Sequence, residues 1–367
     1  MYRLVQRRGI IGLFCLLFVA SSVVPGWAQK DNRFEVSKNL DIFNSLLKEV
    51  EMFYVDSVDV DKTVQRGIEA MLAGLDPYTE YYPEQKTEEL SLMTTGEYGG
   101  IGSLIRQRNN EGGVMIAEPT EGMPADLAGL KPGDLILAID TIDVSKATNS
   151  RVSELLKGVP NTKMVLTIQR PGEKKPRKFE ITRKQITTPQ VTYYGVKNDS
   201  IGYIYLKAFT IKSAQEVKEA FLDLKKNHNI KSLVLDLRGN GGGVLEGAVQ
   251  IVGMFVPKGS EVLSTKGKIK QWDRTYRTST EPLDTVMPLA ILINGGTASA
   301  AEIVSGSLQD MDRAVLVGQR SFGKGLVQAP RDLPYNGKVK ITMSKYYIPS
   351  GRCIQQIDYS HRKEDGS

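Results

Sequence analysis

The spacing of hydrophobic residues changes twice along the chain, and each change marks a different kind of structure. In the first part, apolar positions such as Leu40, Phe43 and Leu46 recur every three or four residues, which predicts helices. Asp76-Pro77-Tyr78-Thr79 marks a turn late in this part, because proline cannot continue a helix. We therefore expect an N-terminal helical segment over residues 29–93.

Short alternating strands separated by glycine turns follow over residues 94–186. This pattern predicts a small β-rich module. One helix is expected inside it, with Asn149 or Ser150 as the N-cap and with Val152 and Leu155 in its buried stripe.

The last part of the chain, residues 187–367, alternates between strand and helix patterns. Such alternation predicts an α/β domain with a mixed, largely parallel sheet. Apolar runs suit strands that are covered on both faces. The expected elements are strands at 201–206, 232–237 and 289–293 and helices at 214–226 and 245–255.

Residues 1–28 have the pattern of a secretory signal peptide. Three arginines precede an apolar run at 10–20, and Gly26-Trp27-Ala28 offers a small-residue cleavage site. An uncleaved membrane anchor is the alternative, although the apolar run is short for a spanning helix. Either interpretation predicts an exported protein, in the periplasm or on the outer face of the inner membrane.

Charge and cysteine content exclude several classes of function. The formal net charge is +6, and the signal contributes three arginines and no acids, so the remaining chain lies near +3 and no nucleic-acid partner is expected. Cys15 falls in the signal, which leaves Cys353 as the one thiol of the mature chain and precludes a disulfide within it. Cys353 is a packed thiol or a nucleophile, but neither His228 nor His361 is placed by sequence to activate it.

Ser299 is the first candidate catalytic residue. The strand at 289–293 leads into Asn294-Gly295-Gly296-Thr297-Ala298-Ser299, where a helix is expected to begin. A serine at such a turn exposes its hydroxyl beside unpaired amides, so a nucleophile and an oxyanion hole can share one segment. A simple helix N-cap is the alternative interpretation.

Lys324 is the candidate base, because glycines and apolar residues flank it in Ser321-Phe322-Gly323-Lys324-Gly325-Leu326. Burial would lower its pKa and let the neutral amine accept a proton from serine, whereas a loop lysine would reach solvent. A Ser-His-Asp arrangement would have to recruit His228 or His361, both in polar surroundings. Metal-ligand spacing is absent from the sequence, and no cofactor is expected.

Two glycine-rich segments are candidate binding loops. Asp236 to Gly243 ends a buried strand and could complete an oxyanion hole, and its spacing does not fit a phosphate loop. In the β-rich module, a second loop precedes a strand and could hold the terminal carboxylate of a peptide, while a hairpin without a ligand is the alternative. Its residues are Tyr98, Gly99, Gly100, Ile101 and Gly102.

Together these segments resemble the C-terminal processing proteases, also called tail-specific proteases, a Ser-Lys class of serine proteases. The likeness covers nearly all of the mature chain. Residues 236–243 resemble Asp-Leu-Arg-x-Asn-x-Gly-Gly, residues 296–302 resemble Gly-x-x-Ser-Ala-x-Glu, and residues 129–140 resemble the PDZ segment Gly-Leu-x-Pro-Gly-Asp-x-Ile. Lys324 and Gln328 follow Ser299 by 25 and 29 residues, as in that family.

The resemblance implies a crotonase-like peptidase core after a PDZ domain, and it implies roles for single residues. Ser299 would attack the scissile carbonyl, Lys324 would accept its proton, and Gln328 would orient the lysine. Tyr98 to Gly102 would be the loop that binds carboxylates.

The amides of Ala300 and Gly242 would hold the oxyanion, with Gly241 as an alternative. The sequence stops at Ser367, soon after residues 346–352, whereas many family members continue further. We therefore leave homo-oligomer assembly open.

From the sequence we expect an exported endopeptidase that binds protein substrates by their C-terminal tails and uses a Ser-Lys mechanism. A non-catalytic PDZ adaptor would keep the binding loop but have no use for Ser299 and Lys324. A crotonase-like acyl-CoA enzyme is the other alternative, which export and a PDZ module both disfavour. Membrane association would depend on an uncleaved signal.

Overall fold

A computed structural model describes residues 32–108 and 112–359. The predicted signal at 1–28 lies outside the described residues. The chain divides into two compact units at Arg66 and Gly67, and each is considered by itself. Within the described part of the chain, no helix has the length and apolar character needed to cross a membrane.

The first unit contains helix α1 (Arg33–Phe53) and the start of α2 (Val60–Ala73). Both helices were predicted from the three-and-four spacing. No side chain of α1 is buried, and Leu40, Phe43 and Leu46 are exposed. The sequence pattern therefore predicts this helix correctly, but it does not show what would pack against the apolar residues of the helix.

The second unit begins with the rest of α2 and soon contains a strand that the helical prediction for residues 29–93 missed. After α2, the chain forms β1 (Glu80–Tyr82), the 3-10 helix η1 (Glu84–Lys86) and α3 (Thr87–Thr95). Asp76-Pro77 stops the helical period, as expected, but the chain then pairs antiparallel with β18 near the C-terminus. Spacing alone could not reveal that partner, because it lies more than 250 residues away.

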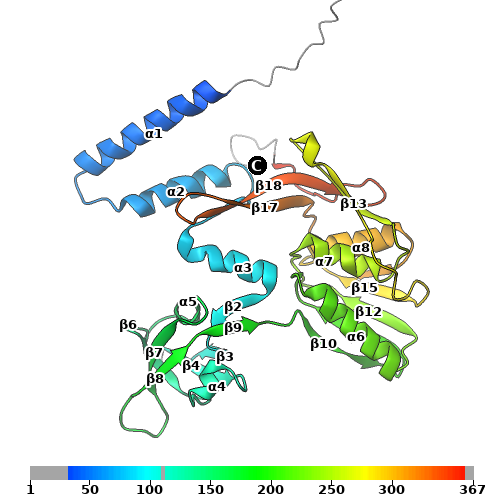
Figure 1. The fold of residues 1–367 in the computed structure, drawn as a ribbon, viewed down its shortest axis with the longest axis horizontal. Coiled ribbons are helices and arrows are strands. Elements are labelled where there is room, and N and C mark those ends of the chain that lie inside the picture. The colour runs from blue at the N-terminus through cyan, green and yellow to red at the C-terminus, as the bar shows by residue number, and fades with distance from the viewer. Residues whose placement is uncertain (1–31, 109–111, 360–367) are drawn as a thin grey trace, which may run out of the picture. The chain divides into compact units, whose positions relative to one another are not determined.

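The predicted β-rich module forms its own sheet, with strand order β3-β4-β5-β7-β8 and β6 paired to β5 (Figure 1). A separate ribbon joins β2 (Glu97–Gly100) to β9 (Lys184–Thr187). The strands of the main sheet are β3 (Ser103–Gln107), β4 (Val114–Pro119), β5 (Leu135–Ile139), β6 (Ile142–Asp143), β7 (Lys163–Gln169) and β8 (Arg177–Thr182).

Two helices pack on this module, α4 (Pro124–Leu127) and α5 (Asn149–Leu156). Val152 is fully buried, as predicted, but the N-cap is Thr148, whose hydroxyl accepts the Arg151 N–H at 3.3 Å. The predicted caps Asn149 and Ser150 are therefore wrong by one or two residues. Several residues here can cap a helix, so local sequence does not choose between them.

The predicted α/β domain is confirmed. Its sheet has the order β10-β11-β12-β15-β16, parallel except for the antiparallel edge strand β10. The strands are β10 (Val191–Lys197), β11 (Ile201–Leu206), β12 (Ser232–Asp236), β15 (Leu289–Ile293) and β16 (Val315–Gly318). The helices are α6 (Ser213–Asn227), α7 (Leu245–Gly253) and α8 (Ala300–Asp310).

A second, antiparallel sheet was not predicted. It has the order β1-β18-β13-β14, with β17 paired to β18. Its other elements are β13 (Glu261–Gly267), η2 (Lys270–Trp272), β14 (Arg274–Arg277), β17 (Leu326–Asp332) and β18 (Lys338–Tyr347). Helix α8 contacts β16 of the parallel sheet and β13 of the antiparallel sheet, so it packs against both sheets.

Candidate active site

Ser299 lies at the turn between β15 and α8, as predicted. It is the N-cap of α8, with φ 56° and ψ −119°. A non-glycine residue in this part of conformational space is strained, and such strain is concentrated at functional sites. The residue is partly exposed at a strand-to-helix turn, which is a position typical of a nucleophilic serine.

The glycine loop after β12 packs directly against this turn. A Cβ placed on Gly242, which has φ +93°, would lie 2.7 Å from Ser299 Cβ and 2.7 Å from the Ala298 carbonyl oxygen. Only glycine can occupy this position without moving the serine. The Ala298 N–H also donates to the Asn240 carbonyl at 2.9 Å, so the two predicted loops form one structure.

Glu302 connects the serine turn to the lysine segment. Its side chain is 3% exposed and accepts hydrogen bonds from four donors. These are Ser299 N–H at 2.8 Å, Lys324 N–H at 2.9 Å, Gly323 N–H at 2.7 Å and Ser321 Oγ–H at 2.7 Å. A single buried carboxylate thus fixes the backbones of both candidate catalytic residues.

Tyr346 on β18 makes a second connection between the same two residues. Its hydroxyl is shared between the carbonyl oxygens of Ser299, at 3.1 Å, and Lys324, at 2.6 Å. The side chain is 1% exposed, and burial raises its pKa well above the usual range. The phenol therefore stays protonated and acts as a donor to the two backbone segments.

The Lys324 side chain is partly buried and has an unusual surrounding. Among the described residues, its amine makes no hydrogen bond or ion pair, and it lies 4.3 Å from the centroid of the Tyr78 ring. Desolvation, followed by repulsion from Lys340, lowers the pKa of the amine. This supports the buried-lysine interpretation over a solvent-exposed one, because removal of water disfavours the ammonium form.

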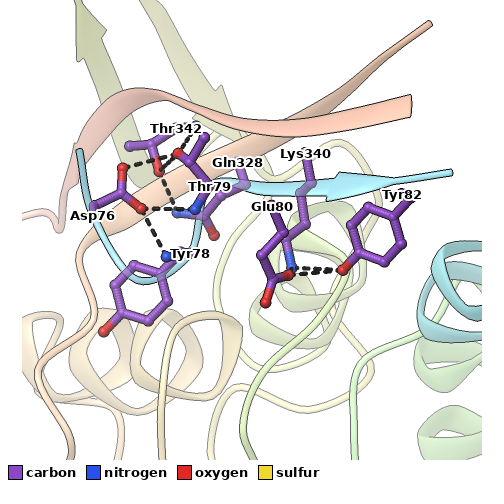
Figure 2. Close-up of polar contacts among 8 residues, drawn as sticks. All are labelled: Asp76, Tyr78, Thr79, Glu80, Tyr82, Gln328, Lys340 and Thr342. Atoms are coloured by element: carbon purple, nitrogen blue, oxygen red, sulfur yellow. Dashed lines mark hydrogen bonds and ion pairs between the residues drawn. The ribbon is translucent and has the colours of Figure 1, made fainter. Parts of the chain in front are cut away.

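Gln328 lies on β17, and its side chain points to a neighbouring strand rather than to the lysine. The amide Nε2 donates to Thr342 Oγ1 at 3.1 Å, as Figure 2 shows. Within the described part of the chain, no hydrogen bond joins Gln328 to Lys324. Its role in orienting the lysine stays a prediction.

The two predicted oxyanion donors differ in their present hydrogen bonding. The Gly242 N–H donates to Asn240 Oδ1 at 2.9 Å. The amides of Ala300 and Gly241 have no acceptor among the described residues. Of the two glycines that we considered, Gly241 therefore has the amide available for a ligand, and Gly242 serves the close approach to Ser299.

The candidate carboxylate-binding loop combines tight packing with unused amides. Ile101 is buried, and its carbonyl and that of Gly102 accept hydrogen bonds from Ala125 and Thr120. In the described structure, the Ile101 and Gly102 amides have no acceptor. Strand β3 follows at the edge of its sheet, next to α5, so one side of the strand has no pairing partner among the described residues.

Lys157, the C-cap residue of α5, also lies at this loop. The Lys157 amine is 5.3 Å from the ring centroid of Tyr98, the first residue of the loop. Gly99 packs so closely that a Cβ would lie 1.8 Å from the Gly158 carbonyl oxygen. Gly99 is therefore required by the contact between two backbone segments.

The sequence motifs predicted no function for Glu302 or Tyr346. The spacing Ser299-x-x-Glu302 fits a capping box, which is a local signal for the Ser299 N–H bond. No local signal exists for Tyr346, because its partners lie 47 and 22 residues away. Among the alternative bases, His228 is exposed beside Asp223, and His361 lies outside the described residues.

Comparisons with known proteins agree with these features. Residues 200–360 match peptidase family S41, and residues 115–170 match the PDZ domain. A carboxy-terminal-processing protease of Bartonella bacilliformis is 36% identical over 345 residues, which are 93% of this chain and 77% of that protein.

Two further similarities were found. A probable CtpA-like serine protease of Staphylococcus aureus is 33% identical over 320 residues, which are 86% of this chain and 62% of that protein. Among solved structures, the photosystem II D1 C-terminal processing protease is 29% identical, with 88% of this chain and 89% of that chain covered and a TM-score of 0.48. The extent and identity of the sequence matches show that this chain belongs to peptidase family S41, the carboxy-terminal-processing serine proteases, and carries a PDZ domain.

Proposed function

We propose that this protein is an exported serine endopeptidase that binds protein C-terminal tails through its PDZ domain and cleaves with Ser299 as nucleophile and Lys324 as general base. One observation carries the proposal. A serine in a strained helix-start conformation and a desolvated lysine without an ion pair among the described residues have their backbones fixed by the same carboxylate, Glu302.

The chemistry follows from these residues. The Ser299 hydroxyl would attack the scissile carbonyl carbon while its proton passes to the neutral Lys324 amine. The amides of Ala300 and Gly241 would donate to the oxyanion. The lysine ammonium would then return the proton to the leaving amine, and water would hydrolyse the acyl-serine bond by the same proton route.

The lowered lysine pKa has a definite consequence for pH dependence. The base is competent only as the neutral amine, so activity rises as pH increases through the pKa of Lys324. Desolvation places that pKa below its usual 10.5. The acidic limb of the pH–rate profile would therefore lie at a lower pH than it would if the base were an exposed lysine.

Tail recognition is supported by the PDZ loop. The unused amides of Ile101 and Gly102 could bind a terminal carboxylate, and the open edge of β3 could pair with the preceding residues of the tail. Binding in this mode depends on a free terminal carboxylate. A peptide with an amidated C-terminus should therefore bind at least tenfold more weakly than the same peptide with a free acid.

The test uses the mature chain with an unfolded protein that carries an apolar C-terminal tail, and products are identified by mass spectrometry. Ser299→Ala and Lys324→Ala should each lower the rate at least a thousandfold without changing thermal unfolding. Lys218→Ala, which removes an exposed lysine on α6 away from these contacts, is the control and should cleave at the unchanged rate.

Cleavage by the Ser299→Ala protein at the original rate would contradict the mechanism. Tail binding without cleavage by the unaltered protein would favour a PDZ adaptor. Export is tested separately, by the appearance of the full chain outside the cytoplasm and its retention inside when residues 1–28 are removed.

A further inference from the structure

The Lys324 amine is covered by an aromatic ring, and its site is otherwise unusual for a buried lysine. The distance of 4.3 Å to the Tyr78 ring centroid is the shortest between any amine and ring in the described structure. Buried lysines are ordinarily paired with a carboxylate. Here, among the described residues, no hydrogen bond or ion pair engages the amine, and the Tyr78 ring lies against it.

More distant charges act on the amine from several elements. Lys340 on β18 disfavours the ammonium form, while Glu80 on β1, Asp76 in the turn and Glu302 on α8 favour it. None of these carboxylates lies within ion-pair distance of the amine. The side chains of Lys340 and Glu80 form an ion pair with each other, and Figure 2 shows both beside Tyr82.

The turn that carries Tyr78 is held rigidly. Asp76 Oδ1 accepts the N–H groups of Tyr78 and Thr79, both at 2.8 Å, and Asp76 Oδ2 accepts the Thr79 hydroxyl at 2.9 Å (Figure 2). Asp76 is 7% exposed. The edge of the Tyr359 ring also packs on the Tyr78 ring, with centroids 5.9 Å apart at 86°.

The same turn is hydrogen-bonded to the antiparallel sheet, whose strand β17 begins two residues after the lysine. Thr342 N–H on β18 donates to Thr79 Oγ1 at 3.1 Å, and Thr342 Oγ1 accepts from Gln328 on β17. Gln328 follows Lys324 by four residues. Figure 2 shows the hydrogen bonds that connect the Tyr78 turn, through Thr79 and Thr342, to Gln328 on the strand that follows the lysine segment.

From this geometry we infer that Tyr78 is a positioning residue for the general base, which covers the Lys324 amine, keeps water from it and holds it in place without an ion pair. The inference rests on the proposed role of Lys324. A carboxylate in the place of the ring would also hold the amine, but it would keep the amine protonated and unable to accept a proton. An aromatic face contacts both the charged and the neutral form.

The ring, and not the hydroxyl group, carries this role. Burial, together with the contact to Tyr359, raises the Tyr78 pKa, so the phenol does not ionise at working pH. Removal of the ring would admit water, and water solvates an ammonium better than a ring does. The lysine would then return toward its ordinary pKa.

The experiment measures the rate at which a fluorophosphonate labels Ser299 from pH 6 to pH 10, which requires no knowledge of the natural substrate. Tyr78→Leu should move the acidic limb of the profile about one pH unit upward, with about tenfold slower labelling on that limb and equal rates at high pH. Tyr78→Phe keeps the ring and should leave the profile unchanged.

A matched control removes a tyrosine ring that lies over the amine of a different lysine. Tyr193 on β10 lies 5.1 Å from the Lys197 amine, and Tyr193→Leu should not alter labelling. If Tyr78→Leu does not fold, Tyr78→Gln replaces it. The glutamine oxygen would accept from the ammonium, so the same upward shift is expected.

The outcomes separate this inference from the proposed function. Labelling of Lys324→Ala at the unaltered rate would overturn both. Loss of labelling in Lys324→Ala, with an unshifted limb in Tyr78→Leu, would overturn the role of Tyr78 alone. A uniformly slower Tyr78→Leu profile would also overturn it, because a merely structural residue lowers the rate without changing the pH dependence.

Discussion

Replacement of Glu302 should separate the serine turn from the lysine segment. In Glu302→Ala, three backbone N–H groups and the Ser321 hydroxyl lose their acceptor. An unsatisfied buried donor costs about 1–3 kcal/mol. The donors around Glu302 are only partly buried, so water can reach some of them, and we expect a total loss of about 3 kcal/mol in the free energy of unfolding.

This loss should appear in the unfolding transition of the peptidase core. For a domain of this size, about 3 kcal/mol corresponds to a fall in melting temperature of roughly 6–12 °C. The transition of the PDZ domain should not move, because Glu302 makes no contact there among the described residues. Fluorophosphonate labelling of Ser299 should fall at least a hundredfold in the same variant.

Two further variants sharpen the test. Glu302→Gln keeps the size and one acceptor but turns an amide donor toward N–H groups, so about half of the stability loss is expected. Glu246 occupies the first turn of α7 and is exposed, so Glu246→Ala should change the melting temperature by less than about 2 °C. A Glu302→Ala protein that melts and labels like the unaltered protein would refute the reasoning.

Two other predictions concern close contacts at the same site. Gly242→Ala would place a methyl group 2.7 Å from Ser299 Cβ, so labelling of Ser299 should fall at least tenfold. Gly239→Ala is the control, because Gly239 also has a positive φ, +72°, but has open space around it. This variant should keep the labelling rate despite backbone strain. Equal labelling of these two variants would contradict the contact argument. Tyr346→Phe leaves the carbonyls of Ser299 and Lys324 without their shared donor, so calorimetry should record a loss of about 1–3 kcal/mol, and an unchanged melting temperature would count against it.

Much of the peptidase core could be predicted because its signals are local. A parallel strand between two layers is a continuous apolar run, and a covering helix has apolar residues every three or four positions. The strands at Ile201–Leu206 and Leu289–Ile293 were therefore placed from the sequence, as was the start of α8 at Ser299. The glycines of the Asp236 to Gly243 loop were likewise visible, although not the contact that requires them.

The antiparallel sheet was missed because β18 pairs with β1 and β13, which are far from it in sequence, and because β1 and β14 have only three and four residues. Glu80 pairs with Lys340, and Leu326 with Lys345. The three residues of β1 are too few to show a pattern, and the alternation of polar and apolar residues in β18 over 338–344 does not identify the strands that pair with it. A strand of three residues gains its identity from its partner. The helical prediction for the N-terminal segment was wrong at β1 for this reason.

The sequence by itself determined the nature of the chain: two folded regions of different pattern, a serine at a helix start, and a lysine placed among glycines. The tertiary structure decided what surrounds them. Only folding could bring the Glu302 carboxylate to both backbones, turn Gln328 toward Thr342 and lay Tyr78 over the Lys324 amine. The physical reason is that residue type and spacing encode local conformation, whereas desolvation and hydrogen bonding depend on partners that long-range strand pairing brings into contact.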